Sequence, residues 1–83
     1  MQLEILTPGQ KVFSGEVNLV KVPGSGGSFE IMKNHAAIIS SLTDGELKVI
    51  TESDETLLYT TSGGVVEVNN NHVVVLIESI SKK

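Results

Sequence analysis

The chain has 83 residues, about half the length of an average domain, so we expect one domain over residues 1–83. Six lysines and no arginine stand against ten acidic residues, and the net charge of −4 argues against nucleic acid as a partner. The chain has no cysteine, which excludes disulfides, zinc-thiolate sites and a thiol nucleophile. The longest apolar run, residues 73–77, is too short to span a membrane, and no signal peptide is visible at the N-terminus.

The composition favours β structure. Val, Ile and Thr make up 24 of the 83 residues, whereas Ala occurs only twice. β-branched side chains suit a pleated sheet and lose rotamer freedom in a helix. Gly and Pro recur at short intervals, and no helical stripe of apolar residues is present. We therefore predict an all-β fold of eight to ten short strands, arranged as a sandwich or barrel.

The first half of the chain is expected to contain a strand over residues 2–6, a turn over 7–10 and a long extended segment over 11–22. The apolar phase of this segment changes after Val17 and Leu19, which predicts a bulge or a strand that passes between two sheets, with a bend near Ser14 and Gly15. A glycine-rich loop follows, then a strand over 29–32. Residues 36–42 are mostly apolar and are predicted to form a strand covered on both faces.

The second half is predicted to contain strands over residues 46–51, 56–61, 65–69 and 72–78. Asp44 and Gly45 lie between apolar runs and predict a tight hairpin. Residues 52–55 are expected to form an exposed acidic turn, and Asn residues at 69–71 suit a turn with left-handed backbone. Residues 79–83 are expected to be frayed.

Three features were considered as sites of chemistry. The glycine-rich loop at residues 23–28 leads into a strand instead of a helix, so it does not predict a phosphate site. His35 and His72 lie far apart in the sequence and have no accompanying nucleophile or ligand set. The carboxylates are spread over turns and strand exteriors. We therefore expect no catalytic residue, no metal, no cofactor and no small-molecule substrate.

Lys33 gives an alternative interpretation. It follows Met32, and a Met-Lys pair at a hairpin tip is the attachment cue of biotinyl and lipoyl carrier domains, which are also small and all-β. Those domains usually have a second Met or similar residue after the lysine, whereas Asn34 follows here. A stand-alone structural sandwich is a third possibility. The residues alone indicate an acidic all-β domain that binds another protein.

The ordered motifs carry a resemblance to a known family. Residues 20–31 and 34–42 hold a Val-x-x-Pro-Gly loop, a strand with a Gly-x-Phe-x-Ile pattern and a His-Ala turn. Gly45–Val49, Ser62–Val68 and Asn71–Leu76 follow in the same order, and residues 13–17 fit as well. Together these segments resemble the epsilon subunit of F-type ATP synthases over nearly the whole chain. The sequence departs from the family at Glu30, which replaces a usual Gly, and at Ala37, which replaces a usual Pro.

The resemblance implies a flattened sandwich of two sheets with about ten strands. It also implies a non-catalytic subunit of the central rotor stalk, which links the gamma subunit to the ring of c subunits and couples proton flow to ATP synthesis. Such a subunit is peripheral to the cytoplasmic face of the bacterial membrane. The family commonly has a C-terminal helical hairpin, and because this chain stops at Lys83 we expect its inhibitory arm to be absent.

The resemblance also implies two contact regions. The residues carried over to the gamma face are Thr7, Phe13, His35, Ile39 and Ser40. The residues carried over to the c ring are Ser25, Gly26, Gly27, Ser28 and Phe29. Phe13 and Ile39 are expected to be apolar anchors in the gamma interface. The ring contact is expected to be polar, although a carboxylate frequent in that loop of the family is replaced here by Ser28.

Overall fold

The β-rich composition is matched by nine strands and no helix. A computed structural model describes residues 1–83. The strands are β1 Gln2–Thr7, β2 Gln10–Val22, β3 Phe29–Met32, β4 Ile38–Leu42, β5 Gly45–Thr51, β6 Thr56–Thr61, β7 Gly64–Asn69, β8 His72–Ile77 and β9 Ile80–Lys82. The all-β prediction is confirmed, with nine strands in place of about ten.

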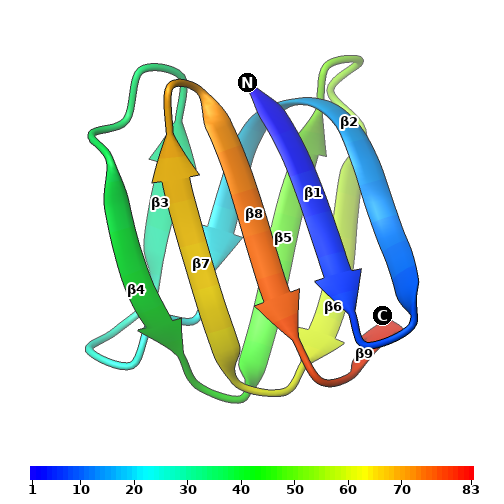
Figure 1. The fold of residues 1–83 in the computed structure, drawn as a ribbon. Coiled ribbons are helices and arrows are strands. Elements are labelled where there is room, and N and C mark those ends of the chain that lie inside the picture. Colours follow the sequence, from blue (N-terminus) through cyan, green and yellow to red (C-terminus); the bar gives the residue numbers. More distant parts are fainter.

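The strands form two layers that face each other (Figure 1). Sheet A has the order β4-β7-β8-β1-β2, and sheet B contains β2, β3, β5, β6 and β9. β1 lies antiparallel to β2 and parallel to β8, so the first and last thirds of the chain meet in one sheet. The strand path is open, running from β4 at one edge to β9 at the other. The fold is therefore a sandwich and not a closed barrel.

β2 belongs to both sheets, as its change of apolar phase predicts. Its first half pairs with β1, and its second half pairs with β3 and β5. The register with β5 shifts between Val17 and Leu19, with Asn18 as the extra residue, and the register with β1 shifts at Val12, so the two irregularities lie on either side of the predicted bend near Ser14 and Gly15. The extra residue reverses the alternation of the two faces along β2. The core-facing positions are therefore odd-numbered over residues 13–17 and even-numbered over residues 20–22. Both halves of β2 thus direct apolar side chains into the space between the sheets.

The core fills the space between the two sheets. It is built mainly from Val, Leu and Ile side chains that alternate along the strands, as predicted: Leu3, Ile5, Val17, Val20, Val22, Ile31, Leu42, Leu47, Val49, Tyr59, Val66, Val68, Val73, Val75 and Ile77. No buried side-chain nitrogen or oxygen lacks a hydrogen-bond partner. Burial raises the pKa of the Tyr59 hydroxyl. This apolar core makes the sandwich a stiff body.

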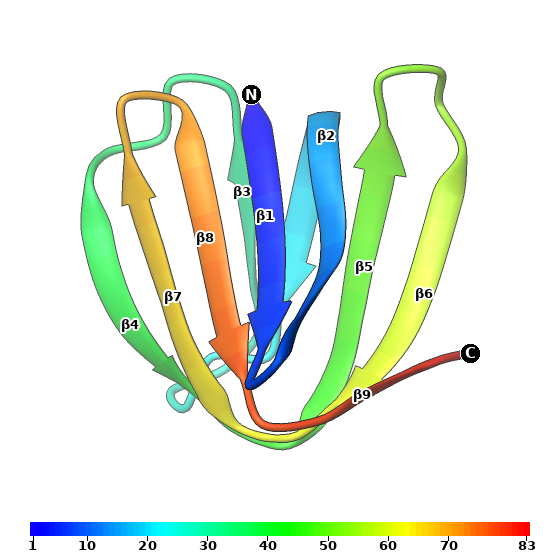
Figure 2. The same cartoon turned by 45° about the vertical axis from the view of Figure 1, so that its right-hand side comes forward.

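Asp44 and Gly45 do not form the predicted hairpin. β4 pairs with β7 in sheet A, whereas β5 pairs with β2 and β6 in sheet B, so this connection crosses between the sheets. The β6–β7 connection crosses at the same end (Figure 2). The Gly63 amide donates a hydrogen bond of 2.8 Å to Asp44 Oδ1, which joins the two crossings. Asp44 therefore acts between connections and not within a turn.

The C-terminal residues are ordered, contrary to the prediction of a frayed end. β9 pairs with β6, and the Lys83 amide donates to the Leu58 carbonyl at 2.8 Å. Ser62 fixes the connection between β8 and β9, because its Oγ accepts hydrogen bonds from the backbone amides of Glu78 and Ser79. These contacts lead the chain from β8 across to the edge of sheet B.

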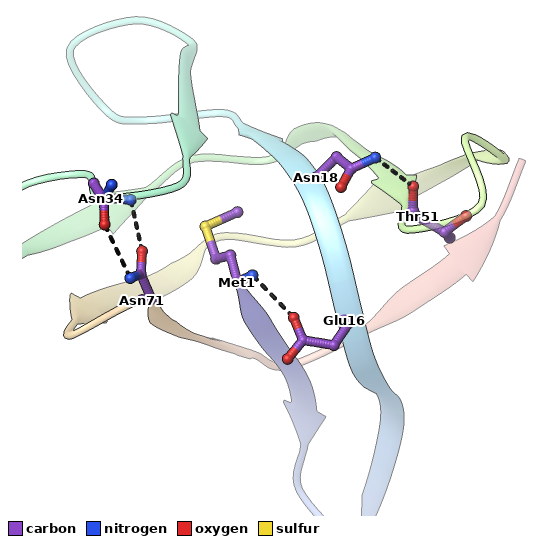
Figure 3. Close-up of polar contacts among 6 residues, drawn as sticks. All are labelled: Met1, Glu16, Asn18, Asn34, Thr51 and Asn71. Carbon is purple, nitrogen blue, oxygen red and sulfur yellow. Dashed lines mark hydrogen bonds and ion pairs between the residues drawn. The ribbon is translucent and has the colours of Figure 1, made fainter.

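The opposite end of the sandwich is held by asparagines. Asn70 and Asn71 have positive φ, which confirms the predicted left-handed turn. The backbone N–H of Asn34 donates to the side-chain Oδ1 of Asn71 at 2.6 Å. In return, the side-chain Nδ2 of Asn71 donates to the side-chain Oδ1 of Asn34 at 3.1 Å (Figure 3). This reciprocal pair attaches the β3–β4 connection to the β7–β8 turn.

Candidate interaction surface

The outer face of sheet A carries exposed apolar side chains. Val65 and Leu76 are registered partners on β7 and β8, and Leu6 on β1 is the partner of Leu76. Partners in register share a face of the sheet, so these three residues form a continuous line, here called the apolar row. Leu76 is 47% exposed and Val65 is 38% exposed. The apolar row borders a hollow that is also lined by Thr7 and Pro8.

Sequence reasoning missed the apolar row. Leu6, Val65 and Leu76 alternate with the core residues of their strands, and the prediction followed only the core-facing set. The signal was nevertheless present, because these strands carry apolar residues on both faces at these positions. A contiguous set of apolar residues on the solvent face of a sheet indicates a surface that another molecule covers.

β4 lies at the edge of sheet A beside this face. Ile39 is 74% exposed, so the prediction that residues 36–42 are covered on both faces is wrong within this chain. β4 has no charged residue, proline or bulge, which are the usual protections of an edge strand. Ser40 alternates with Ile39 and is half-buried. The exposed face of sheet A therefore continues onto an edge that is unprotected over residues 38–40, because the chain at Gly24 pairs with the other end of β4.

The structure places the five predicted gamma residues in two groups. His35, Ile39 and Ser40 lie in or before β4, whereas Thr7 and Phe13 lie in β1 and β2 at the far side of sheet A. Two strands, β7 and β8, separate β4 from the strand of Thr7, and three separate it from the strand of Phe13. The half-buried His35 places Nδ1 2.8 Å from the Ala36 carbonyl oxygen.

Phe13 and Thr7 differ in their surroundings. Phe13 is paired with the buried Ile5 and packs against the core, so its ring contributes to the stability of the fold. Only the remaining exposed part of the ring is available to a partner. Thr7 lies beside the apolar row. Of the two predicted anchors, Ile39 is free for a partner, and Phe13 is only partly so.

The predicted ring residues form a loop at one end of the sandwich. This ring loop, residues 25–29, lies at the same end as the β1–β2 turn, and the β3–β4 connection, which contains His35, lies at the opposite end (Figure 1). Ser25, Gly26, Gly27 and Ser28 are exposed, while Phe29 is half-buried against the core. Gly27 has φ of 128°, a conformation that favours glycine. The ring loop therefore exposes polar residues at 25–28 and is attached to the core through Phe29.

Sheet B has an apolar row of its own. Leu19 is the registered partner of both Met32 and Ile50, and Met32 is 50% exposed. Leu19 and Ile50 are half-buried. This row provides a comparison surface of similar exposure on the opposite face.

A cluster of three charged or ionisable side chains lies beside the apolar row without forming a reactive site. His72 Nε2 lies 3.0 Å from Glu4 Oε1, and Lys11 Nζ lies 3.4 Å from Glu4 Oε2. Hydrogen bonds from His72 and Lys11 hold the pKa of the Glu4 carboxyl below its usual value. No three His, Cys, Asp or Glu side chains converge as a metal site would require. No helix suited to crossing a membrane is present.

Lys33 is not at a hairpin tip. It lies in the connection between β3 and β4, but β3 pairs with β2 and β4 pairs with β7. The structural cue for a biotinyl or lipoyl carrier is therefore missing, and the alternative based on Lys33 is not supported.

Comparison with known proteins decides the family. Residues 1–83 match the model of the family described as ATP synthase, Delta/Epsilon chain, beta-sandwich domain. The chain belongs to this family. The ATP synthase epsilon chain of Chlorobaculum tepidum is 34% identical over 79 residues, which cover 95% of this chain and 90% of that protein. That of Maridesulfovibrio salexigens is 45% identical over 80 residues, which cover 96% of this chain and 56% of that protein.

Solved structures show the same fold as this delta/epsilon chain. A chain of the Euglena gracilis mitochondrial ATP synthase, solved as OSCP/F1/c-ring, superposes with a TM-score of 0.90 at 21% identity. The match covers 96% of this chain and 51% of that chain. A chain of the Tetrahymena thermophila mitochondrial ATP synthase, solved as central stalk and c ring, gives a TM-score of 0.80 at 19% identity. It covers 98% of this chain and 65% of that chain. The sandwich predicted by the resemblance is confirmed.

Proposed function

We propose that this chain is a non-catalytic subunit of the central stalk of an F-type ATP synthase. In this proposal residues 1–83 act as one domain that links the gamma subunit to the c ring and helps couple ion flow to ATP synthesis. The subunit is peripheral to the membrane, on its cytoplasmic face. Membership of the delta/epsilon family and the names of the relatives support this assignment.

The observation that carries the gamma contact is the apolar row beside the exposed edge strand. Gamma is proposed to cover Leu6, Val65 and Leu76 together with Ile39 on β4. Covering these side chains removes apolar surface from water, at about 25 cal/mol per Å². Thr7 lies next to the row and His35 precedes β4, so these two residues are proposed to form the rim of the contact. Ser40 is the registered partner of the buried Val66 and faces the core side of sheet A, so any contact it makes with gamma would be through its backbone. Phe13 packs against the core and is proposed to stabilise sheet A beneath the contact.

The c ring is proposed to contact the ring loop, residues 25–29. Its exposed serines and glycines offer hydroxyl groups and backbone amides and carry no charge. We therefore expect a contact made by hydrogen bonds and weakly dependent on salt, because charged contacts between exposed groups are the ones that salt screens.

Binding of purified gamma to the chain tests the proposed gamma surface. Leu76→Asp should weaken binding by about tenfold or more, because an anchor at the centre of an interface contributes over 1 kcal/mol. Met32→Asp is the matched control, since its side chain has similar exposure on the opposite sheet. It should change binding by less than about threefold. If Met32→Asp weakens binding and Leu76→Asp does not, gamma covers the other sheet.

Single-cysteine cross-linking in assembled synthase tests the ring contact. The chain has no cysteine, so each variant carries one reactive thiol. Ser28→Cys should cross-link to the c subunit, and Ser53→Cys, in the turn at the opposite end, should not. Cross-linking from Ser53→Cys alone would reverse the proposed orientation. Failure of the chain to assemble with either partner would refute the stalk assignment.

A further inference from the structure

The ring loop begins on an extra strand-like segment attached to β4. The Ser25 amide donates to the Ser41 carbonyl at 3.0 Å, and the Thr43 amide donates to the Pro23 carbonyl at 2.8 Å. An isolated antiparallel bridge joins Gly24 to Leu42 between them. β4 is therefore paired with β7 on one side and with the start of the loop on the other.

A side-chain hydrogen bond strengthens this junction. Ser41 Oγ donates to Ser25 Oγ at 3.0 Å. Ser41 is the residue after Ser40 in β4, and Ser25 is the first residue of the ring loop. The backbone and hydroxyl bonds between these two serines, here called the serine clasp, join the strand proposed for gamma to the loop proposed for the c ring.

The loop folds back onto the same junction. The Gly27 amide donates to the Gly24 carbonyl at 2.9 Å, and Gly24 is buried. A Cβ at Gly24 would lie 2.7 Å from the Gly27 carbonyl oxygen and 2.8 Å from the Phe29 ring. Phe29 in turn packs against the core. The loop therefore has little room to swing without breaking its bonds to β4.

We propose that Ser41 is a positioning residue that holds the ring loop in a fixed relation to β4. Through the serine clasp, one strand carries both contacts, so force applied at Ile39 and Ser40 reaches residues 25–29 over a short path of hydrogen bonds. The clasp is a property of the isolated chain, and its mechanical role rests on the function proposed above.

Amide hydrogen exchange in the isolated full-length chain tests the clasp. Ser41→Ala removes the hydroxyl and should raise the exchange rate of the Ser25 amide by about threefold to tenfold, which is the range for one modest hydrogen bond. Ser41→Thr retains a hydroxyl and should restore slow exchange. Ser81→Ala, at an exposed serine of β9 with no side-chain bond, should have no effect.

A second variant provides a stronger perturbation. Gly24→Ala should raise the exchange rate of the amides of Ser25 and Gly27 further than Ser41→Ala, because the added methyl group forces the loop away from Phe29. Protection of the β5 amides would show that the chain is still folded. If Ser25 exchange is unchanged in both variants, the clasp does not position the loop and the proposal is overturned.

The assembled synthase tests the role of the clasp. In a Ser28→Cys background, Ser41→Ala should lower cross-linking to the c subunit by about threefold. Ser41 is the registered partner of Val65 beside the apolar row, and because alanine keeps this position small and apolar, gamma binding should stay within about twofold of the parent. Equal losses at both partners, or no loss at either, would overturn the mechanical role. If the parent itself contacts neither partner, the stalk function fails, and the exchange experiment still decides whether Ser41 positions the loop.

Discussion

Glu4 joins neighbouring strands of sheet A through its carboxylate. His72 on β8 and Lys11 on β2 both reach it from the flanking strands. Exposed ion pairs contribute little singly, yet this group lies beside the apolar row and fixes side chains at its border. Its lowered pKa means that the folded chain holds the ionised form more strongly than the unfolded chain does.

Replacement of Glu4 should therefore have a pH-dependent effect on stability. The carboxylate stabilises the fold above its unfolded-state pKa, and this contribution is lost as the pH falls through about 4 towards the lower folded-state value. Glu4→Gln should be less stable than the parent at pH 7, and the difference should shrink on acidification. Urea unfolding of both proteins between pH 7 and pH 3 measures this. Glu52→Gln, whose carboxylate makes no ion pair, is the control, and a gap that stays constant with pH would contradict the prediction.

β2 shows how one element is divided between two sheets. Its irregularity at Asn18 places this side chain over the end of β5, where Nδ2 donates to the Thr51 carbonyl at 3.1 Å (Figure 3). The same Nδ2 also donates to Asp54 Oδ1 at 3.2 Å. Asp54 has φ of 65° in the β5–β6 turn. The bulge in β2 therefore also holds a turn in which a non-glycine residue adopts left-handed backbone.

Loss of the Asn18 amide should loosen that turn. Asn18→Ala removes both hydrogen bonds and should lower the free energy of unfolding by about 1 kcal/mol. Chemical denaturation measures the change. Asn69→Ala is the matched control, because Asn69 is an exposed strand residue with no side-chain hydrogen bond, and it should stay within about 0.5 kcal/mol of the parent. A cost at Asn69 equal to that at Asn18 would show that the bonds at the bulge are not responsible.

β9 and the β4–β5 connection show where element prediction failed. The Asp44-Gly45 pair has the composition of a hairpin turn, but β4 finds its partner in β7, more than twenty residues later. Residues 79–83 have little apolar character, and their order comes from Ser62 and from the edge of β6. In both cases a distant segment supplies the decisive hydrogen bonds. No local pattern of residues can report such partners.

The connectivity of the complete chain makes folding depend on distant segments. β1 pairs in parallel with β8, so Gln2 meets His72 across nearly the whole sequence. We expect refolding in milliseconds to seconds, because loop closure must precede these contacts. Stopped-flow fluorescence of Tyr59, or circular dichroism, measures the rate. Complete refolding within microseconds would contradict the prediction.

The candidate surface was predictable only in part. The glycines and serines predicted a loop at residues 23–28, whereas the contact roles of that loop and of Ile39 came from the family resemblance. The strand of Ile39 was expected to be covered on both faces. The apolar row was missed because Leu6, Val65 and Leu76 are far apart in the sequence and become neighbours only through the pairing of β1, β7 and β8. The separation of Phe13 from Ile39 by three strands was likewise invisible before the strand order was known.

The sequence by itself determined the class of the fold, most strand positions, the core-facing residues and the family, because alternation and turn residues act over a few positions and the motifs keep their order. The tertiary structure alone decided which strands pair, which connections cross between the sheets and which exposed side chains adjoin. Strand pairing depends on hydrogen bonds and packing between segments up to seventy residues apart, and a local pattern specifies a strand's faces but not its neighbour.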